Sequence, residues 1–361
     1  MASIPTTVVF DVSGHGFGHL GQVAPVIQAL RQQYPQSRIV LRSAHPAPLL
    51  RDFLDCDVVL APPPHEATMV MHGPTSVDAV RSAEAHRQVC EHWEEHVARE
   101  AERLAGFGPA ILVSDVCYLS LGAAKQLGIP AVALCSLNWG DIVRAYCGSD
   151  QGTSTVLDTI DTTYAAADLF LQVEPHMPME RLPNRRPIGP LARIGRARRG
   201  EVAAAAHIPE QEKIVLVSLG GIPGGAELTL PSVPGVHWLA GAGVSGPAGA
   251  VTCAGSLGIP FVDLLASSDA VITKVGYSTF VEAACNGTAL ISAPRDDWPE
   301  SPYLIAWAER NARFALTDGG LDAREIGRAL EEVLSAPPRP PVPATGVEEA
   351  CCVIAKTADL L

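Results

Sequence analysis

The chain contains no apolar run as long as the ~20 residues that a membrane-spanning helix needs, so no transmembrane segment is expected. Its nine cysteines include no CxxC pair, a spacing that commonly holds a metal. The opening MASIPTTVVF has no basic segment ahead of its apolar residues, as a secretory leader would have. These absences favour a cytoplasmic protein with reduced thiols.

Positive charge is also scarce. The 26 lysine and arginine residues face 39 acidic ones, which gives a net charge of −13, and no basic stripe with interleaved aromatic residues occurs. Nucleic acid is therefore not an expected partner. Hydrophobic residues make up 47% of the 361 residues, which argues against a disordered chain and favours two domains with substantial cores.

Two halves of the chain repeat one pattern, an apolar strand that runs into a glycine-rich loop. VVFDV leads into SGHGFGH over residues 8–19, and IVLVS leads into LGGIPGG over residues 214–225. A doubly wound α/β domain begins in this way, with its ligand at the carboxyl ends of the strands. The sequence therefore predicts an α/β fold with two Rossmann-like domains, residues 1–190 and 207–344.

Other segments are predicted from their composition. Arg181 to Arg199 holds seven arginines, two glycines and three prolines without a clear period, which is typical of a linker. The highly charged stretch from Asp78 to Leu104 predicts one long helix, and residues 347–361 predict a last helix.

The strongest nucleotide signal lies in the second half, in the stretch that begins SDAVITKVGY. Ala270 to Thr273 predicts a buried strand, and Gly276 with Ser278 and Thr279 predicts a loop that caps the next helix. Amide N–H groups and the positive end of the dipole at a helix N-terminus favour a diphosphate. Glu282 lies one turn in, where its carboxylate can accept hydrogen bonds from a ribose diol. The segment predicts a nucleotide-sugar pocket.

This segment resembles the donor-binding segment of GT-B glycosyltransferases. The resemblance implies two domains that face each other across a cleft, a nucleoside diphosphate sugar as donor, and a terminal helix that packs back on the first domain. It also implies that dipoles and basic side chains neutralise the leaving diphosphate, so neither a metal nor a cofactor is expected. On this basis, the residues expected to bind the donor are Gly220, Gly221, Phe261, Lys274, Gly276, Tyr277, Ser278, Thr279, Glu282, Asp296 and Asp297.

Some of these residues have a plainer explanation that the sequence leaves open. Lys274 can neutralise a phosphate, although an exposed surface lysine would look the same. Asp296 and Asp297 can hold sugar hydroxyls, although solvated loop charges would look similar. The glycines at 220 and 221 can bring backbone amides to a phosphate, or they can serve a simple turn.

The glycine-rich loop near the N-terminus carries two histidines. Gly16 to Gly21 matches GxGxxG, a weak dinucleotide-binding pattern here because the acid expected about 20 residues further on is missing. Arg42 could suit a 2′-phosphate, which keeps an NADP-dependent oxidoreductase as a minor alternative. Because an unperturbed imidazole titrates near neutral pH, His15 and His19 suit catalytic proton transfer, with a core or helix-capping histidine as the competing explanation.

Two further resemblances involve the first half. His19 matches the histidine in the glycine-rich loop of the peptidoglycan glycosyltransferases that transfer N-acetylglucosamine to a lipid, although residues 15–17 depart from that loop. VSGHGFGHLGQVAPVIQAL, LVSDVCYLSLGAAKQLGIPAVALCSLNWGDIVRAY and ITKVGYSTFVEA are similar to the GT-B-like region of plant-type arabinokinases and to its stand-alone bacterial relatives. No kinase domain follows within the 361 residues, so no kinase activity is implied.

Asp115 ends a predicted strand on the same side as the histidine loop. A helix N-cap is the ordinary role of such a residue. By resemblance to small-molecule glycosyltransferases, Asp115 instead orients His19, which removes the acceptor's proton. The residues expected to contact the acceptor are Gly16, Phe17, Asn138, Trp139 and Asp141, and a surface turn is the alternative account of the last three.

A zinc site is the less favoured explanation of another motif. His92 to His96 reads HWEEH and matches HxxEH, the inverted zinc-protease motif. That motif needs a further acidic ligand in a defined context, so a solvated helix face is preferred and no metal is predicted.

The sequence thus predicts a glycosyltransferase that moves a sugar from a nucleoside diphosphate sugar, with a UDP-sugar favoured, to a small-molecule or lipid acceptor. A nucleotide-sugar 2-epimerase of the same fold would need no acceptor. A non-catalytic nucleotide-sugar-binding protein would form no product. The base, the sugar and the acceptor depend on the shape of the pocket, which the sequence does not give.

Overall fold

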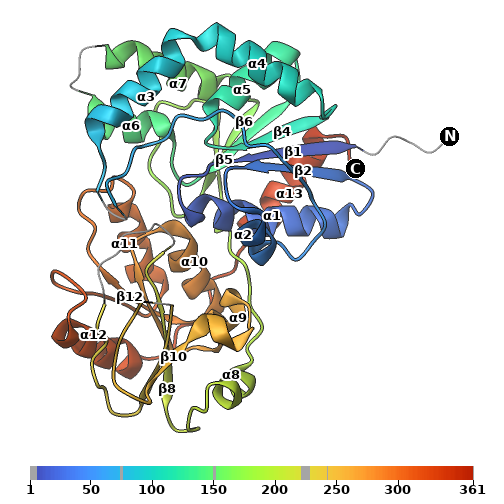
Figure 1. Cartoon of the computed structure of the whole chain (residues 1–361). Helices are drawn as coiled ribbons and strands as arrows, with labels where there is room; N and C mark the ends of the chain where they lie inside the picture. Colours follow the sequence, from blue (N-terminus) through green and yellow to red (C-terminus); the bar gives the residue numbers. More distant parts are fainter. Residues whose placement is uncertain (1–5, 74–75, 149–151, 221–227, 242, 361) are drawn as a thin grey trace. The chain divides into compact units, whose positions relative to one another are not determined.

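The structure is a computed structural model of the chain, and it describes residues 6–73, 76–148, 152–220, 228–241 and 243–360. The chain divides into two compact units (Figure 1). Unit 1 contains Met1–His72, Ser76–Leu191 and Thr345–Leu361. Unit 2 contains Gly73–Thr75 and Ala192–Ala344.

Unit 1 is built on a parallel sheet of seven described strands in the order β3-β2-β1-β4-β5-β6-β7. The order reverses between β1 and β4, which makes the carboxyl ends of these two strands the switch point where such sheets bind ligands. The strands are β1 Thr7–Val12, β2 Arg38–Ser43, β3 Val59–Ala61, β4 Ile111–Asp115, β5 Ala131–Cys135, β6 Leu169–Val173 and β7 Arg185–Ile188.

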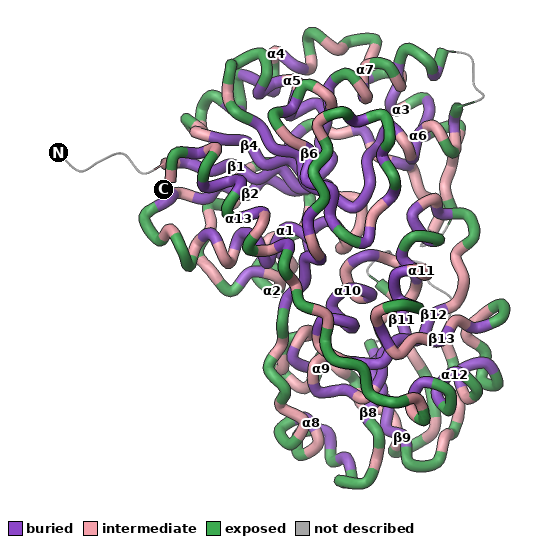
Figure 2. The backbone as a smooth tube through the Cα atoms, turned by 180° about the vertical axis from the view of Figure 1, so that it is seen from behind, coloured by how far each residue is buried: buried purple, intermediate pink, exposed green. Residues whose placement is uncertain are grey.

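Helices lie on both faces of this sheet (Figure 1). Because both faces are covered, β1, β4 and β5 consist entirely of buried residues, most of them apolar, and Thr7, Asp11, Ser114 and Asp115 are the buried polar ones. Figure 2 shows β1 and β4 in the colour of buried residues. The helices are α1 Phe17–Gln33, α2 Ala47–Phe53, α3 Ala79–Glu91, α4 Trp93–Ala105, α5 Tyr118–Leu127, α6 Trp139–Cys147, α7 Thr153–Ala165 and α13 Gly346–Thr357.

Helix α13 returns the end of the chain to unit 1. It packs against α1, and the Cys351 thiol donates to the carbonyl of Val26 across a distance of 3.6 Å. The short segment before α13 is anchored as well, because the amide of Gly346 donates to the carbonyl of Pro190.

Unit 2 repeats the same plan with a parallel sheet of six described strands in the order β10-β9-β8-β11-β12-β13. Its switch point lies between β8 and β11. The elements are α8 Arg199–Ala205, β8 Lys213–Ser218, β9 Val236–Ala240, β10 Val251–Cys253, the 3₁₀ turn Ala254–Leu257, α9 Phe261–Ser267, β11 Ala270–Lys274, α10 Tyr277–Asn286, β12 Ala289–Ala293, α11 Ser301–Asn311, β13 Phe314–Leu316 and α12 Ala323–Ser335.

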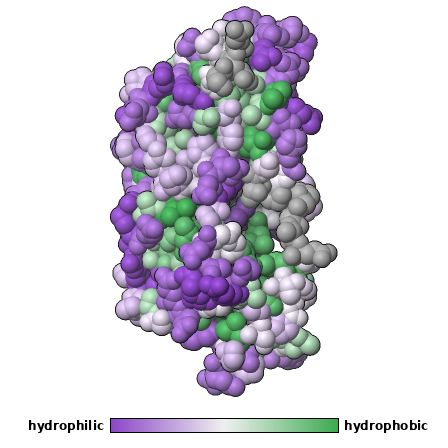
Figure 3. All heavy atoms as spheres, turned by 90° about the vertical axis from the view of Figure 1, so that its left-hand side faces the viewer, coloured by the Kyte–Doolittle hydropathy of each residue, from purple (hydrophilic) through white to green (hydrophobic). Residues whose placement is uncertain are grey.

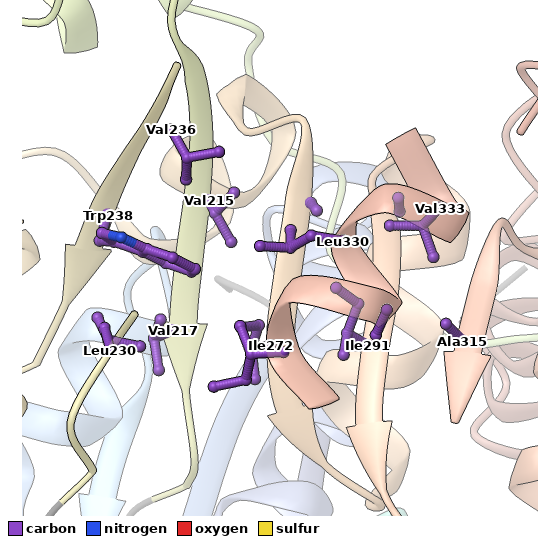
Figure 4. Close-up of a cluster of buried hydrophobic side chains, with 14 of the residues drawn as sticks. Val215, Val217, Leu230, Val236, Trp238, Ile272, Ile291, Ala315, Leu330 and Val333 are labelled. Atoms are coloured by element: carbon purple, nitrogen blue, oxygen red, sulfur yellow. The ribbon is translucent and has the colours of Figure 1, made fainter. Parts of the chain in front are cut away.

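One hydrophobic cluster of unit 2 lies between its sheet and α12 (Figure 4). Trp238 on β9, Ile272 on β11 and Ile291 on β12 pack in one cluster with Leu330 and Val333 of α12. Each of these five side chains is at most 1% exposed. Together they fix the strands whose carboxyl ends carry the polar residues described below.

Most strand predictions are confirmed, and two other predictions need correction. β2 and β4 have the predicted bounds. The single helix predicted over 78–104 is wrong, because His92 leaves helical geometry (φ −112°, ψ 29°) and separates α3 from α4. The predicted linker is partly ordered into a sheet, since β7 lies within it as an edge strand.

Among the described residues, no helix is both long and apolar enough to cross a membrane. The face drawn in Figure 3 shows hydrophilic side chains over much of its area, with hydrophobic ones in small patches between them. The large hydrophobic side chains that are exposed are Val59, Val80, Leu127, Ile194 and Tyr303.

Candidate functional site

The switch point of unit 1 brings a histidine and an aspartate together. α1 begins at Phe17, after Gly16 turns the chain at φ +78°, so His19 lies in the first turn of the helix rather than in the loop. Asp115 is the last residue of β4, which pairs with β1. His19 Nδ1 is 3.1 Å from Asp115 Oδ1, and both side chains are buried. The predicted His–Asp pair therefore has hydrogen-bonding geometry.

A thiol completes this buried group. The Sγ atom of Cys135, at the end of β5, is 3.8 Å from His19 Nδ1. Ligand atoms of His19, Asp115 and Cys135 all lie within 4.8 Å of one another, and this is the one such group of three among the described residues. Imidazole, carboxylate and thiolate are ligands that zinc accepts. These three residues could hold a metal, or His19 and Asp115 could act as a proton-transfer pair.

Aromatic rings surround His19. The indole of Trp139 has its ring centre 5.9 Å from His19 and 5.2 Å from His15. Phe17 contacts His45, with ring centres 5.9 Å apart. Burial, helped by the nearby His19, lowers the pKa of His45, so this ring is neutral at physiological pH. The site in unit 1 is therefore lined by aromatic and imidazole rings.

Glu66 is a site residue that the sequence did not reveal. It lies in the connection between β3 and α3, where it is half-buried. Its Oε2 accepts from the Gly14 amide and its Oε1 from the Trp139 indole N–H, both at 3.3 Å. Burial raises the pKa of Glu66, and hydrogen bonds from Ser13 and charge from His19 oppose this rise. A loop glutamate 52 residues from its glycine partner gives no local signal.

The glycine loop of unit 1 does not resemble a pyrophosphate cradle. The Gly14 amide donates to Glu66, the His15 amide to Ser13 Oγ, and the Gly16 amide to the Gly14 carbonyl. These three amides are thus committed within the protein. A dinucleotide fingerprint would present such amides to phosphate oxygens.

The NADP alternative loses its other support as well. Arg42, which was expected to suit a 2′-phosphate, is only 1% exposed. Its Nη2 donates to Glu100, and its Nε is 3.3 Å from Asp11 Oδ1. Arg42 neutralises two buried carboxylates inside the unit and is not available to a ligand. The expectation that Arg42 could bind the 2′-phosphate of NADP is therefore wrong.

Asn138, Trp139 and Asp141 form the start of α6. Asn138 Oδ1 caps the helix by accepting from the Asp141 amide at 2.8 Å, and Asp141 is paired with Arg144. Asn138 and Trp139 are at most 1% exposed. The alternative account of a surface turn is therefore wrong for Asn138 and Trp139, which form a buried helix start. Contact with the acceptor stays a prediction, and of these three residues Trp139 lies beside His15 and His19.

The switch point of unit 2 gathers positive charge. Lys274 ends β11, and its chain lies against Gly220, which follows β8 at φ +89°. A Cβ at position 220 would lie 2.7 Å from Lys274 Cε, so a larger residue there would displace the end of this lysine. Burial and the neighbouring Arg295 lower the pKa of Lys274 to about 8. Arg295, which the sequence did not suggest, follows β12 and stacks over Trp298 at 4.6 Å.

The N-terminus of α10 lies directly after Lys274. Gly276 is the N-cap, without a side-chain cap, and no acidic residue occupies the first turn. Ser278 and Thr279 were predicted to form a loop, but the helix begins at Tyr277 and places them in its first turn. Tyr277 is buried, whereas Ser278 and Thr279 are half-buried. This terminus has the positive dipole end that the sequence predicted for a diphosphate.

Glu282 is occupied by a partner from its own unit. Its Oε1 accepts from Arg193 Nε at 2.6 Å and its Oε2 from Arg193 Nη2 at 3.2 Å. The side chain is 1% exposed, and burial raises the pKa of Glu282 while Arg193 opposes the rise. Contact with a ribose therefore stays a prediction, and it requires that Arg193 release at least one carboxylate oxygen.

The remaining donor residues are spread around the same edge. Phe261 begins α9, and Asp296 and Asp297 are exposed in the turn after β12. Asp297 Oδ1 is 3.8 Å from Arg295 Nε, so this acid lies beside the cation. Gly221 lies outside the described residues.

The HxxEH motif is not assembled as a zinc site in the described part of the chain. His92 stands at the break between α3 and α4, its side chain is 64% exposed, and its Nδ1 is 4.0 Å from Glu95. His96 stacks on His65 instead, with ring centres 4.5 Å apart.

No family model matches the chain. Its sequence is 25% identical over 312 residues to the L-arabinokinase of Arabidopsis thaliana, a match that covers 82% of this chain and 29% of the kinase. The chain thus spans less than a third of that relative. It is also 25% identical over 284 residues to an uncharacterized glycosyltransferase of Methanopyrus kandleri, covering 72% of this chain and 80% of the relative.

Solved structures share the fold over almost the whole chain. A UDP-glucosyltransferase of Polygonum tinctorium superposes with a TM-score of 0.59 and 13% identity, covering 100% of this chain and 94% of the enzyme. A putative UDP-N-acetylglucosamine 2-epimerase of Listeria monocytogenes gives 0.53 and 11%, covering 99% and 98%. The chain therefore has the GT-B fold and is related in sequence to the plant arabinokinase and the Methanopyrus glycosyltransferase.

Proposed function

We propose that the chain is a glycosyltransferase that moves a sugar from a nucleoside diphosphate sugar, with a UDP-sugar favoured, to the hydroxyl group of an acceptor. The observation that carries the proposal is the His19–Asp115 pair at the unit 1 switch point, with Nδ1 and Oδ1 3.1 Å apart. Sequence similarity to a glycosyltransferase and the shared fold support the reaction class.

Unit 2 is the proposed donor site. Lys274 and the N-terminus of α10 are the groups that we propose to bind the diphosphate, with Arg295 adjacent. Positive charge at this position favours the donor and, more strongly, the diphosphate that leaves, because charge grows there as the bond to the sugar breaks. Glu282, Asp296 and Asp297 are the proposed contacts to the ribose and the sugar hydroxyls.

Unit 1 is the proposed acceptor site, with His19 as general base. Asp115 accepts a hydrogen bond from the N–H at Nδ1 and so holds the tautomer in which Nε2 is basic. Nε2 takes the proton of the acceptor hydroxyl while that oxygen attacks the anomeric carbon of the sugar. The bond from the anomeric carbon to the diphosphate breaks, and its electron pair leaves with the diphosphate. His15 is placed beside Trp139 to contact the acceptor.

The experiment measures release of nucleoside diphosphate from a panel of nucleotide sugars, with and without a panel of hydroxyl acceptors. We expect acceptor-dependent release with one donor family, and a loss of about 10²–10⁴-fold in kcat for His19→Ala, because a positioned general base contributes that much. His92→Ala is the matched control, since this exposed histidine lies outside the site. Equal rates in wild type and His19→Ala would contradict the assignment.

A nucleotide-sugar 2-epimerase is the second candidate, and the structural match to the Listeria protein favours it. An epimerase would convert the donor sugar without an acceptor. The same assay separates the two, because NMR of the sugar incubated alone would show an epimer. A non-catalytic binding protein would bind the nucleotide sugar saturably and form neither product.

A further inference from the structure

Glu66 places a negative charge where a glycine loop ordinarily receives an anion. Loop amides that follow the first strand of such a sheet commonly bind phosphate. Here the Gly14 amide donates to the Glu66 carboxylate at 3.3 Å instead. The same carboxylate accepts from the Trp139 indole, whose ring contacts both His15 and His19. Glu66 is therefore part of the cluster around the proposed base.

The charged groups near Glu66 do not offset its negative charge. Arg42, the buried guanidinium of this region, is held by Asp11 and Glu100. His45 is neutral because burial lowers its pKa. Asp115 adds a second carboxylate beside His19. A phosphate group brought to the loop would meet two carboxylates, and like charges at close range disfavour binding.

We propose that Glu66 is a specificity residue that keeps anionic groups away from the glycine loop, so that the acceptor presents an uncharged, hydroxyl-bearing group to His19. The acceptor class is then a sugar, polyol or other neutral alcohol rather than a phosphate or lipid diphosphate that binds the loop through its charge. The partly exposed rings of His15, Phe17 and His45 suit the apolar faces of such a molecule, and a carboxylate suits its hydroxyls. This inference rests on the proposed acceptor role of unit 1.

The test is a titration with inorganic phosphate at constant ionic strength, followed by the ring signals of His15 and His19 in proton–carbon NMR spectra. Wild type is expected to show no saturable shift of these signals. Glu66→Gln keeps the size of the side chain but removes the charge and one of the two acceptor oxygens that Gly14 and Trp139 use. We expect a saturable shift with an apparent Kd at least about tenfold below the highest phosphate concentration at which wild type shows none. Glu66→Asp retains the charge and should behave as wild type. Wild-type behaviour of this variant would also show that the fold tolerates a substitution at position 66.

Glu102→Gln is the matched control, because Glu102 is exposed on α4 and lies outside the cluster. It should give the wild-type result. Saturable phosphate binding by wild type at these signals would overturn the proposal. The absence of binding in both wild type and Glu66→Gln would overturn it too, since another feature would then exclude the anion. No transfer reaction is measured, so failure of the glycosyltransferase proposal is seen separately.

Discussion

Units 1 and 2 share one strand order around their switch points, yet opposite charges gather there. Carboxylates of Glu66 and Asp115 surround the glycine loop and His19 in unit 1. Lys274, Arg295 and a helix N-terminus gather at the equivalent place in unit 2. The shared topology favours a ligand site in each unit, and under our proposal the anionic ligand belongs to unit 2, where the positive charge lies.

The two glycines that follow the first strand of each unit show how this difference arises. Gly14 directs its amide to Glu66, so the backbone of unit 1 is occupied by a carboxylate. Gly220 lacks a Cβ that would collide with Lys274, so the backbone of unit 2 makes room for a cation. Similar strand–glycine sequences therefore lie beside a negative charge in unit 1 and beside a positive charge in unit 2.

Glu282→Ala should have the largest effect on the folding of one unit. It leaves the buried Arg193 guanidinium without its carboxylate partner, which costs about 3–5 kcal/mol in free energy of unfolding. We expect denaturant unfolding to show this loss and hydrogen exchange to rise in unit 2 peptides. The double variant Arg193→Met/Glu282→Leu should recover most of the stability. A loss below about 1 kcal/mol would mean that this pair is not what holds residues 192–195 to α10.

Lys274→Met removes the cation of unit 2 while keeping an apolar chain of similar length. We expect the Kd for the nucleoside diphosphate to rise about 10–100-fold, because a charge-assisted hydrogen bond is worth about 1.5–3 kcal/mol. Isothermal titration calorimetry measures the change. Lys213→Met is the control, since Lys213 lies at the amino end of β8, whereas Lys274 lies at the carboxyl end of the neighbouring strand β11. Equal losses in both variants would point to general electrostatics rather than a site.

Donor affinity should also depend on pH through the same lysine, with a smaller effect. The pKa of Lys274 is lowered to about 8, so the ammonium is present below this pH and is lost above it. Affinity should fall as pH rises, by about twofold at the pKa, where half of the amine is neutral. Lys274→Arg should remove this step, because arginine stays charged. If the wild-type affinity stayed constant from about pH 6.5 to about pH 9, the ammonium of Lys274 would not contact the ligand.

The strands could be predicted from the sequence because buried parallel strands contain consecutive apolar residues, as at residues 39–41 of β2 and 111–113 of β4. The break at His92 could not, since neither glycine nor proline marks it and packing sets its geometry. Within the sites, Asp115 ends a strand and His19 follows a glycine-rich loop, so both could be singled out from the sequence. Glu66 and Arg193 come from connections distant in sequence, and only the folded chain places them beside Gly14 and Glu282.

The most direct test of the contrast between the units is hydrogen exchange with mass spectrometry, run with UDP, GDP, dTDP, CDP, ADP and NADP in turn. We expect one nucleoside diphosphate to protect residues 274–282 and 293–298 of unit 2, and the loop at residues 13–19 of unit 1 to change little. Protection of that loop alone, or protection by NADP alone, would contradict the account and make unit 1 the nucleotide site.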